Sequence, residues 1–387
     1  MAVIIVLAFL RVNLGFTMLL GAAILGFLLL SPSDAALSMV CYAVEFKALD
    51  LAASVALIAL LGSLLKATGQ MRSLVDALKE AGVGSRPLMA FIPAILGTLP
   101  MPGGALLSAP MVEEEGRKSG VPPREGAYIN LWFRHVVFLI YPFTPALILL
   151  SELVGIDLEY IVPHLIAPFL AMVAVGYLLS LRGVRGVVGA KNLNWMTVKR
   201  ILLGLLPLAV VPVLDLALDV PHTIPVVVGV VLALLLSRPT GSELVKVVRD
   251  AKLPNFTLSM IGIMVFRGIM IKTGVSQAVY QALQGLALPL PLLITLLSFL
   301  IGFSTGYPSA SIVILASLLP SLTSMGLIMG LYTASVIGYV ISPLHLCLVV
   351  TSEYFSVSFR DMYPKLILSA AATLLTTLLL IPVYSLT

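Results

Sequence analysis

The sequence predicts an all-α polytopic membrane protein made of two inverted-topology repeats, each with five transmembrane helices and one re-entrant hairpin. Three observations lead to this fold class. Of the 387 residues, 60% are apolar and only 11% are charged, whereas a soluble domain carries about 25% charged residues. Apolar runs long enough to cross a bilayer recur along the whole chain. Two further runs are interrupted by Gly, Pro and Ser at equivalent places in the two halves.

The apolar runs define the expected spans in chain order. About ten spans are predicted, at 2–11, 14–30, 50–66, 125–152, 157–181, 201–218, 222–237, 255–272, 326–350 and 362–386. The runs at 87–116 and 289–320 contain GTLPMPGGA and GFSTGYPSAS midway. A lipid-exposed break would leave backbone groups without hydrogen bonds, so such loops occur only inside protein or beside a water-filled cavity. Both runs are therefore expected to be re-entrant hairpins.

The distribution of charge predicts the orientation. With the basic linker 182–200 in the cytoplasm, all but four of the 23 Lys and Arg residues fall on the cytoplasmic side. Both termini are then outside a prokaryotic plasma membrane. The opposite side receives Lys47, Lys272 and a set of acids: Glu152, Asp157, Glu159, Asp215 and Asp219. The basic residues form no stripe, which excludes nucleic-acid binding. Cys41 and Cys347 are far apart and are expected to be apolar packing residues.

An internal repeat divides the chain into residues 1–181 and 201–387. At an offset of 205, Thr68-Gly69 aligns with Thr273-Gly274, and Gly97 aligns with Gly302. Each half has an odd number of spans, so the halves insert in opposite orientations. The first hairpin is expected to enter from the cytoplasm and the second from outside. Interrupted segments at matching positions of inverted halves indicate a binding site near the membrane midplane.

At this point the chain resembles the ion transporter superfamily of secondary carriers, which includes citrate, C4-dicarboxylate and gluconate permeases. The likeness rests on RVNLGFTMLLGAAILGFLLL at 11–30, PMPGGALLSAP at the first tip and GFSTGYPSAS at the second. More narrowly, the chain is similar to an uncharacterised prokaryotic branch of integral membrane proteins in that superfamily. The resemblance implies a scaffold domain, a transport domain that carries both hairpins, a homodimer and elevator-type movement. Sodium-coupled dicarboxylate members carry Ser-Asn-Thr at each tip, and here the Asn is absent from both.

The two tips are the predicted substrate site. They contribute Thr98, Pro100, Met101, Pro102, Gly103 and Gly104 from the first hairpin, and Ser304, Thr305, Gly306, Tyr307, Pro308 and Ser309 from the second. Proline breaks each hairpin into two half-helices. A half-helix that begins at a tip presents free N–H groups to an anion. One that ends there presents carbonyls, which can hold a coupling Na⁺ together with the hydroxyls of Thr98, Ser304 and Thr305. Alternatively, these hydroxyls bond only their own backbone.

Ionisable residues within the spans complete the predicted site. An Arg at membrane depth is costly and usually faces a partner or a cavity. Arg134 is placed to reach the first tip, with Asn130 one turn earlier as a polar partner; its alternative role is to bond carbonyls. Arg267 lies near an external end, where it can contact ligand or snorkel. His135 is either a proton carrier or a packed histidine. No Asp or Glu is expected at mid-depth, and this excess of positive charge favours an anionic substrate.

The sequence thus predicts a secondary active transporter of a small organic anion, coupled to Na⁺ or H⁺, and no enzyme. A passive anion channel or facilitator on the same fold is the alternative, because rate and coupling are not encoded in the sequence. An intramembrane enzyme is a remote alternative. Its only support is G-x-S-x-G at 302–306, a motif that requires a preceding strand where a helix is predicted. The expected partners are the lipid bilayer, a small anionic solute and a second copy of the chain.

Overall fold

The computed structural model describes residues 12–99, 104–187, 193–218, 220–285, 288–318 and 324–384. Helices form throughout this part of the chain, which contains no strand. Six helical segments within it are long and apolar enough to cross a membrane: Phe46–Ala67, Leu158–Leu181, Trp195–Asp215, Gly241–Lys272, Met325–Phe355 and Phe359–Tyr384. The predicted span 2–11 and the tip residues Pro100, Met101, Pro102 and Gly103 lie outside the described residues.

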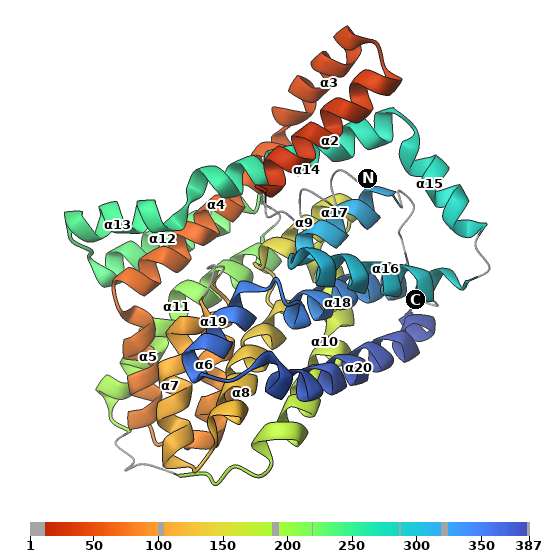
Figure 1. Cartoon of the computed structure of the whole chain (residues 1–387). Helices are drawn as coiled ribbons and strands as arrows, with labels where there is room; N and C mark the ends of the chain where they lie inside the picture. Colours follow the sequence, from red (N-terminus) through yellow and green to blue (C-terminus); the bar gives the residue numbers. More distant parts are fainter. Residues whose placement is uncertain are drawn as a thin grey trace.

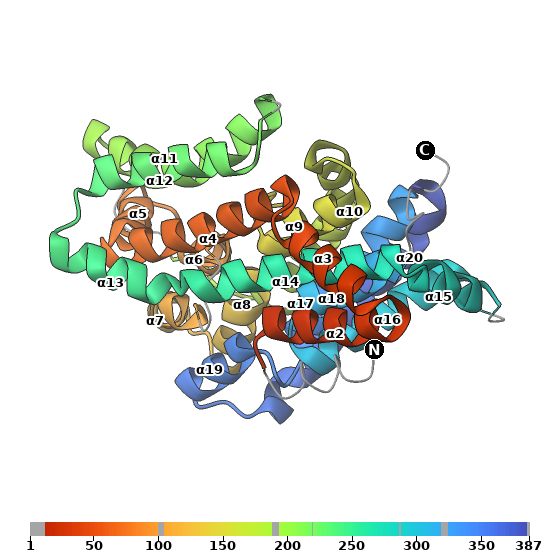
Figure 2. The same cartoon turned by 90° about the horizontal axis from the view of Figure 1, so that it is seen from above.

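The helices form two groups (Figures 1 and 2). The first group comprises α2 (Leu14–Leu29), α3 (Pro32–Ala43), α4 (Phe46–Ala67), α11 (Trp195–Ala217), α12 (Thr223–Ser237), α13 (Gly241–Ala251) and α14 (Leu253–Lys272). In this group α14 packs against α2, α3 and α4, and α12 packs against both α4 and α11. The closest contact joins α2 to α14. A Cβ on Gly15 would overlap the Leu258 carbonyl, so only glycine lets these backbones touch.

The second group holds both interrupted segments. It comprises α6 (Ser85–Gly97), α7 (Ala105–Lys118), α8 (Pro123–Val136), α9 (Pro145–Val154), α10 (Leu158–Gly176), α16 (Leu290–Thr305), α17 (Pro308–Leu318), α18 (Met325–Ile341), α19 (Leu346–Phe355) and α20 (Phe359–Tyr384). A π-helical turn at Tyr177–Leu181 extends α10, and a 3₁₀ turn at Val137–Leu139 follows α8. Two short helices connect the groups: α5 (Gln70–Glu80) contacts α4 and α6, and α15 (Val275–Gln284) contacts α14 and α17.

Both runs expected to be hairpins consist of two helices that pack against each other. In the first hairpin α6 packs against α7, and in the second α16 packs against α17. Gly306 ends α16 in the left-handed conformation, with φ of 68°, and Pro308 begins α17 two residues later. This geometry follows from the sequence, because glycine adopts positive φ without strain and proline fits the first turn of a helix.

Two runs expected to be continuous spans are each broken. The run 125–152 contains α8 and α9, separated at 137–144, and the run 326–350 contains α18 and α19, separated at 342–345. A proline lies at or just before the start of each second helix. Pro145 is the first residue of α9, and Pro343 lies in the turn before α19. Segments 31–49, 67–86, 238–252 and 273–288, expected to be loops, contain α3, α5, α13 and α15.

The order of helices from α4 to α10 recurs from α14 to α20. The turn after α4 has Thr68 bonded to the Leu64 carbonyl and Gly69 at φ of 68°. The turn after α14 has Thr273 bonded to the Ile269 carbonyl and Gly274 at φ of 71°. These matching details lie at the offset of 205 found in the sequence.

The same recurrence appears where the helices cross. Gly97 on α6 lies against the Arg134 carbonyl on α8, and Gly302 on α16 lies against the Ser335 carbonyl on α18. After α9 the Ser151 hydroxyl donates to the Ile156 carbonyl, and after α19 the Ser352 hydroxyl donates to the Val357 carbonyl. Helix order and local contacts therefore recur together.

A buried carboxylate fixes the far end of the first hairpin. Glu115 on α7 is 3% exposed and accepts hydrogen bonds from the Ser85 hydroxyl at 2.7 Å and the Lys118 ammonium at 2.9 Å. Lys79 on α5 pairs with Glu115 at 3.3 Å and with Glu114 at 2.9 Å. Hydrogen bonds from Lys118 and Lys79 lower the pKa of Glu114 to about 2. This cluster ties α5, which leaves the first group, to the hairpin.

Candidate functional site

A cavity of about 260 Å³ lies where the second hairpin tip meets the breaks after α8 and α18. We call it the tip cavity. Six predicted site residues line it: Arg134, His135, Gly306, Tyr307, Pro308 and Ser309. Aromatic side chains of Phe138, Phe256 and Tyr339 form part of its wall. The structure therefore brings the second tip together with the ionisable pair on α8.

Three helices begin at the tip cavity. Its lining includes Pro145 and Ala146 at the start of α9, Pro308 and Ser309 at the start of α17, and Leu346 and Cys347 at the start of α19. Each helix has at least ten residues. The first N–H groups of a helix have no partner within it, and its N-terminus carries a partial positive charge. The starts of these three helices therefore contribute positive potential to the cavity, while the ends of α8, α16 and α18 beside it contribute negative potential.

The Arg134 guanidinium is the charged side chain in the tip cavity. It is 2% exposed, and it donates to the Leu96 carbonyl at 2.8 Å and to the Leu99 carbonyl at 3.4 Å. These carbonyls end α6, so Arg134 occupies the negative end of that half-helix, beside the first tip. Its Nε has no hydrogen-bond partner among the described residues.

The remaining tip residues have local partners. The Thr98 hydroxyl donates to the Ile95 carbonyl and the Thr305 hydroxyl to the Ile301 carbonyl, each at 2.7 Å, while Ser304 is exposed. Gly104 precedes α7 and is buried. The amide of Asn130, expected beside Arg134, donates instead to the Ala105 carbonyl and the Thr351 hydroxyl, each at 3.2 Å. Asn130 thus joins α8 to α7 and α19.

Two residues outside the predicted site, His345 and Cys347, join His135 in the tip cavity, although Cys347 was expected only to pack. The donor atoms of His135, His345 and Cys347 all lie within 4.8 Å of one another, and all three residues are buried. The imidazole rings of His135 and His345 are 4.6 Å apart and nearly perpendicular. No sequence spacing marks this cluster, because more than 200 residues separate His135 from the other two.

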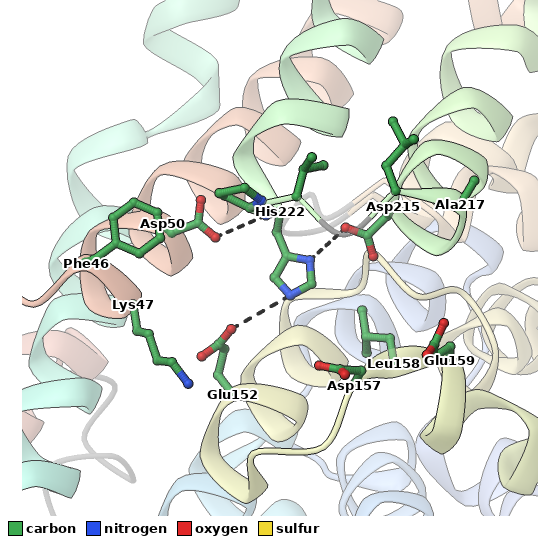
Figure 3. A pocket seen from close by; sticks show the side chains of 13 residues that line it. Phe46, Lys47, Asp50, Glu152, Asp157, Leu158, Glu159, Asp215, Ala217 and His222 are labelled. Atoms are coloured by element: carbon green, nitrogen blue, oxygen red, sulfur yellow. Dashed lines mark hydrogen bonds and ion pairs between the residues drawn. The ribbon is translucent and has the colours of Figure 1, made fainter.

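A second, larger cavity of about 640 Å³ lies between the two helix groups. We call it the acidic cavity, because it is lined by Asp50, Glu152, Asp157, Glu159 and Asp215, with Lys47 and His222 (Figure 3). Four of these acids were assigned from the sequence to the same membrane side. Arg267 lines neither cavity and donates to the Leu153 carbonyl at 3.0 Å, near the end of α9 and beside Glu152.

His222 links the two helix groups across the acidic cavity (Figure 3). Its Nδ1 lies 2.7 Å from Asp215 on α11, and its Nε2 lies 3.8 Å from Glu152 on α9. The Asp50 carboxylate on α4 accepts a hydrogen bond from the His222 backbone N–H at 3.1 Å. Burial alone lowers the pKa of His222, but the hydrogen bond to Asp215 and the charges of Asp215, Glu152 and Asp50 outweigh burial and raise the pKa.

Comparison with known proteins agrees with this helical fold. No curated protein sequence matches the chain. The solved structure of the Alcanivorax borkumensis YdaH transporter, whose topology is described as unusual, is similar over 99% of this chain and 98% of its own. The TM-score is 0.67 at 17% sequence identity, so the likeness is one of fold. The family model described as "Protein of unknown function (DUF401)" matches residues 1–384, and the chain therefore belongs to the DUF401 family.

Proposed function

We propose that this protein is a secondary active transporter that moves a small organic anion across the membrane. The observation that carries the proposal is the convergence of three helix N-termini and the Arg134 guanidinium on one cavity. Preorganised N–H groups and a buried cation favour a carboxylate or another anion. A volume of about 260 Å³ suits a small solute. The likeness in fold to a solved transporter supports the same assignment.

We assign the first helix group to a scaffold and the second to a moving transport domain. The second group holds both hairpins and all of the tip-cavity lining except Phe256 of α14, so its displacement would carry the solute with it. Specific polar contacts join the groups at the acidic cavity, through His222 and through Arg267 with the Leu153 carbonyl. This division suits elevator-type alternating access.

The recurrence of helix order supports a description as two inverted repeats, with ten spans and two re-entrant hairpins. An odd number of spans in each repeat gives the halves opposite orientations and places both termini outside the plasma membrane. Gly/Pro breaks at equivalent positions then meet from opposite sides, as in other carriers with inverted repeats. We further propose a homodimer, with Na⁺ or H⁺ as the coupling ion.

Transport by purified protein in liposomes tests this proposal. Vesicles loaded with one candidate anion should accumulate its labelled form by exchange, and an inward Na⁺ or H⁺ gradient should drive net uptake. The candidate anions are first ranked by the thermal stabilisation that each gives in detergent. A ligand at about 100 times its Kd stabilises the folded state by roughly 2.7 kcal/mol. Flux that dissipates every gradient and never concentrates solute would identify a channel or facilitator. Absence of flux for every stabilising anion would refute the transporter assignment.

A further inference from the structure

We infer that His135, His345 and Cys347 form a binding site for a thiophilic d¹⁰ metal ion, Zn²⁺ or Cu⁺, in the wall of the tip cavity. This inference goes beyond the proposed transport function and does not depend on it. The two imidazole nitrogens and the sulfur are donors of the kinds that both ions prefer. Their donor atoms already lie within 4.8 Å of one another, on buried side chains.

Backbone carbonyls fix which nitrogen of each histidine is available. Nδ1 of His135 lies 2.7 Å from the Leu131 carbonyl, and Nδ1 of His345 lies 3.2 Å from the Val340 carbonyl. A carbonyl only accepts a hydrogen bond, so both Nδ1 atoms must carry the hydrogen, and both Nε2 atoms present a lone pair. A carbonyl that accepts a hydrogen bond from the other ring nitrogen orients the histidine ligands of metal sites.

A bound metal ion would provide a partner for both of these buried Nε2 lone pairs. His135 and His345 are 0% and 1% exposed, and their Nε2 atoms have no hydrogen-bond partner among the described residues. A buried polar group without a partner destabilises the folded state. The Cys347 thiol has one hydrogen and can satisfy only one of the two imidazoles. One metal ion would satisfy both lone pairs and the sulfur together.

The place of Cys347 in the fold suits a metal-bound thiolate. The thiolate is the form of cysteine that binds metal, and Cys347 lies in the first turn of α19, whose N-terminus stabilises negative charge. Zn–S and Zn–N bonds of about 2.3 and 2.0–2.1 Å place ligand atoms roughly 3.3–3.7 Å apart. The widest separation in the cluster would therefore close by about 1 Å. Three protein ligands leave a fourth position free in a tetrahedral site.

The positive charge of Arg134 in the tip cavity predicts that Zn²⁺ and Cu⁺ binding would differ in their dependence on an anion. A Zn²⁺–thiolate unit keeps one positive charge beside Arg134 and three helix N-termini, so it needs an anion as fourth ligand. A Cu⁺–thiolate unit is neutral and needs none. Zn²⁺ should therefore bind more tightly when a small carboxylate such as acetate is present, and Cu⁺ should not. This coupling rests on the proposed anion site, whereas metal binding itself does not.

Metal titration of the purified full chain tests the inference. The protein is stripped with a chelator, and Zn²⁺ alone or Cu⁺ with a reductant is added in competition with a chromophoric chelator. We expect one ion per chain, and an affinity at least about 100-fold weaker in Cys347→Ser and His345→Gln, since even second-shell losses weaken binding 10–100-fold. Matched controls are Cys41→Ser, which removes the other, exposed cysteine, and His164→Gln, whose Nδ1 also bonds a carbonyl four residues earlier.

A second measurement, which needs no substitution at the metal site, distinguishes loss of metal binding from misfolding of the variants. In a Cys41→Ser background Cys347 is the only thiol, and bound metal should slow its alkylation by a maleimide at least tenfold. Unchanged alkylation, binding at no fixed stoichiometry, or equal affinity in Cys347→Ser and the controls would overturn the inference. A chain that binds metal but transports no anion would retain this inference and lose the transporter proposal, so the two failures are distinguishable.

Discussion

Arg134 makes two contributions that a pair of substitutions can separate. Its guanidinium caps α6 through the Leu96 and Leu99 carbonyls, and its charge lies in the tip cavity. Arg134→Lys keeps the charge but presents a single ammonium in place of a two-pronged donor. Arg134→Gln keeps an N–H₂ donor and removes the charge. We expect stability to follow the hydrogen-bond donors and anion binding to follow the charge.

The magnitudes follow from the burial of Arg134. Each variant leaves one buried carbonyl without a partner, which costs about 1–3 kcal/mol. Unfolding temperatures should therefore fall in both variants, to similar extents. A charge about 5 Å from a bound anion, at an effective dielectric constant near 20, contributes about 3 kcal/mol. Arg134→Gln should thus weaken anion binding roughly 150-fold, and Arg134→Lys should weaken it by less than about tenfold.

The assay is anion-dependent thermal stabilisation in detergent, titrated to obtain Kd for wild type and both variants. Arg249→Gln is the matched control, since Arg249 lies on α13 with 74% of its side chain exposed. Equal loss of anion binding in Arg134→Lys and Arg134→Gln would show that geometry, and not charge, decides affinity. Normal binding in Arg134→Gln would remove Arg134 from the site altogether.

Two further predictions concern the polar links described above. Because the pKa of His222 is raised above 6.5 in the folded state, its stabilising contribution is complete below the unfolded pKa and is lost as pH rises through the folded value. Wild-type unfolding temperature should fall as pH rises above about 6.5, and His222→Gln should flatten that fall; an unchanged slope would show that other groups titrate. Glu115→Ala should destabilise the protein by about 1–3 kcal/mol. Glu115 is 3% exposed, and its carboxylate contacts the Ser85 hydroxyl and the Lys79 and Lys118 ammonium groups. Glu114→Ala, at a position 46% exposed, should cost less than about 1 kcal/mol, and equal losses in the two variants would contradict the burial argument.

The hairpin breaks could be predicted because local chemistry determines them. Gly306 and Pro308 fix the second tip whatever surrounds it. The breaks before α9 and α19 were missed, although length gave a signal for the first of them. A continuous helix over 125–152 would be roughly 42 Å long, against about 30 Å of hydrocarbon. Proline occurs in the middle of some membrane helices, so Pro145 alone did not distinguish a kink from a break.

The helices taken for loops are amphipathic and short. In α5 the residues Met71, Leu74, Val75 and Ala77 are buried, a helical spacing, but charged residues between them lower the mean hydropathy of the segment. A search for apolar runs does not detect such helices.

The candidate site likewise contains some residues that the sequence predicted and others that it did not. The cavity-lining residues of the second tip followed from sequence, whereas His345 and Cys347 meet His135 only through the packing of α8 against α18 and α19.

If the protein is the proposed transporter, the single helix α9 would influence how voltage acts on transport. Its first residues line the tip cavity and Glu152, near its end, lines the acidic cavity. Ten residues span about 15 Å, roughly half the hydrocarbon thickness. The acidic cavity is lined by six charged side chains and His222 and would be hydrated. With α9 along the membrane normal, the transmembrane electric field would fall across this shorter distance. Moving one elementary charge through 100 mV changes its energy by about 2.3 kcal/mol. Under the proposed function, ion or anion steps along α9 would then experience about twice the field strength found across an unbroken bilayer.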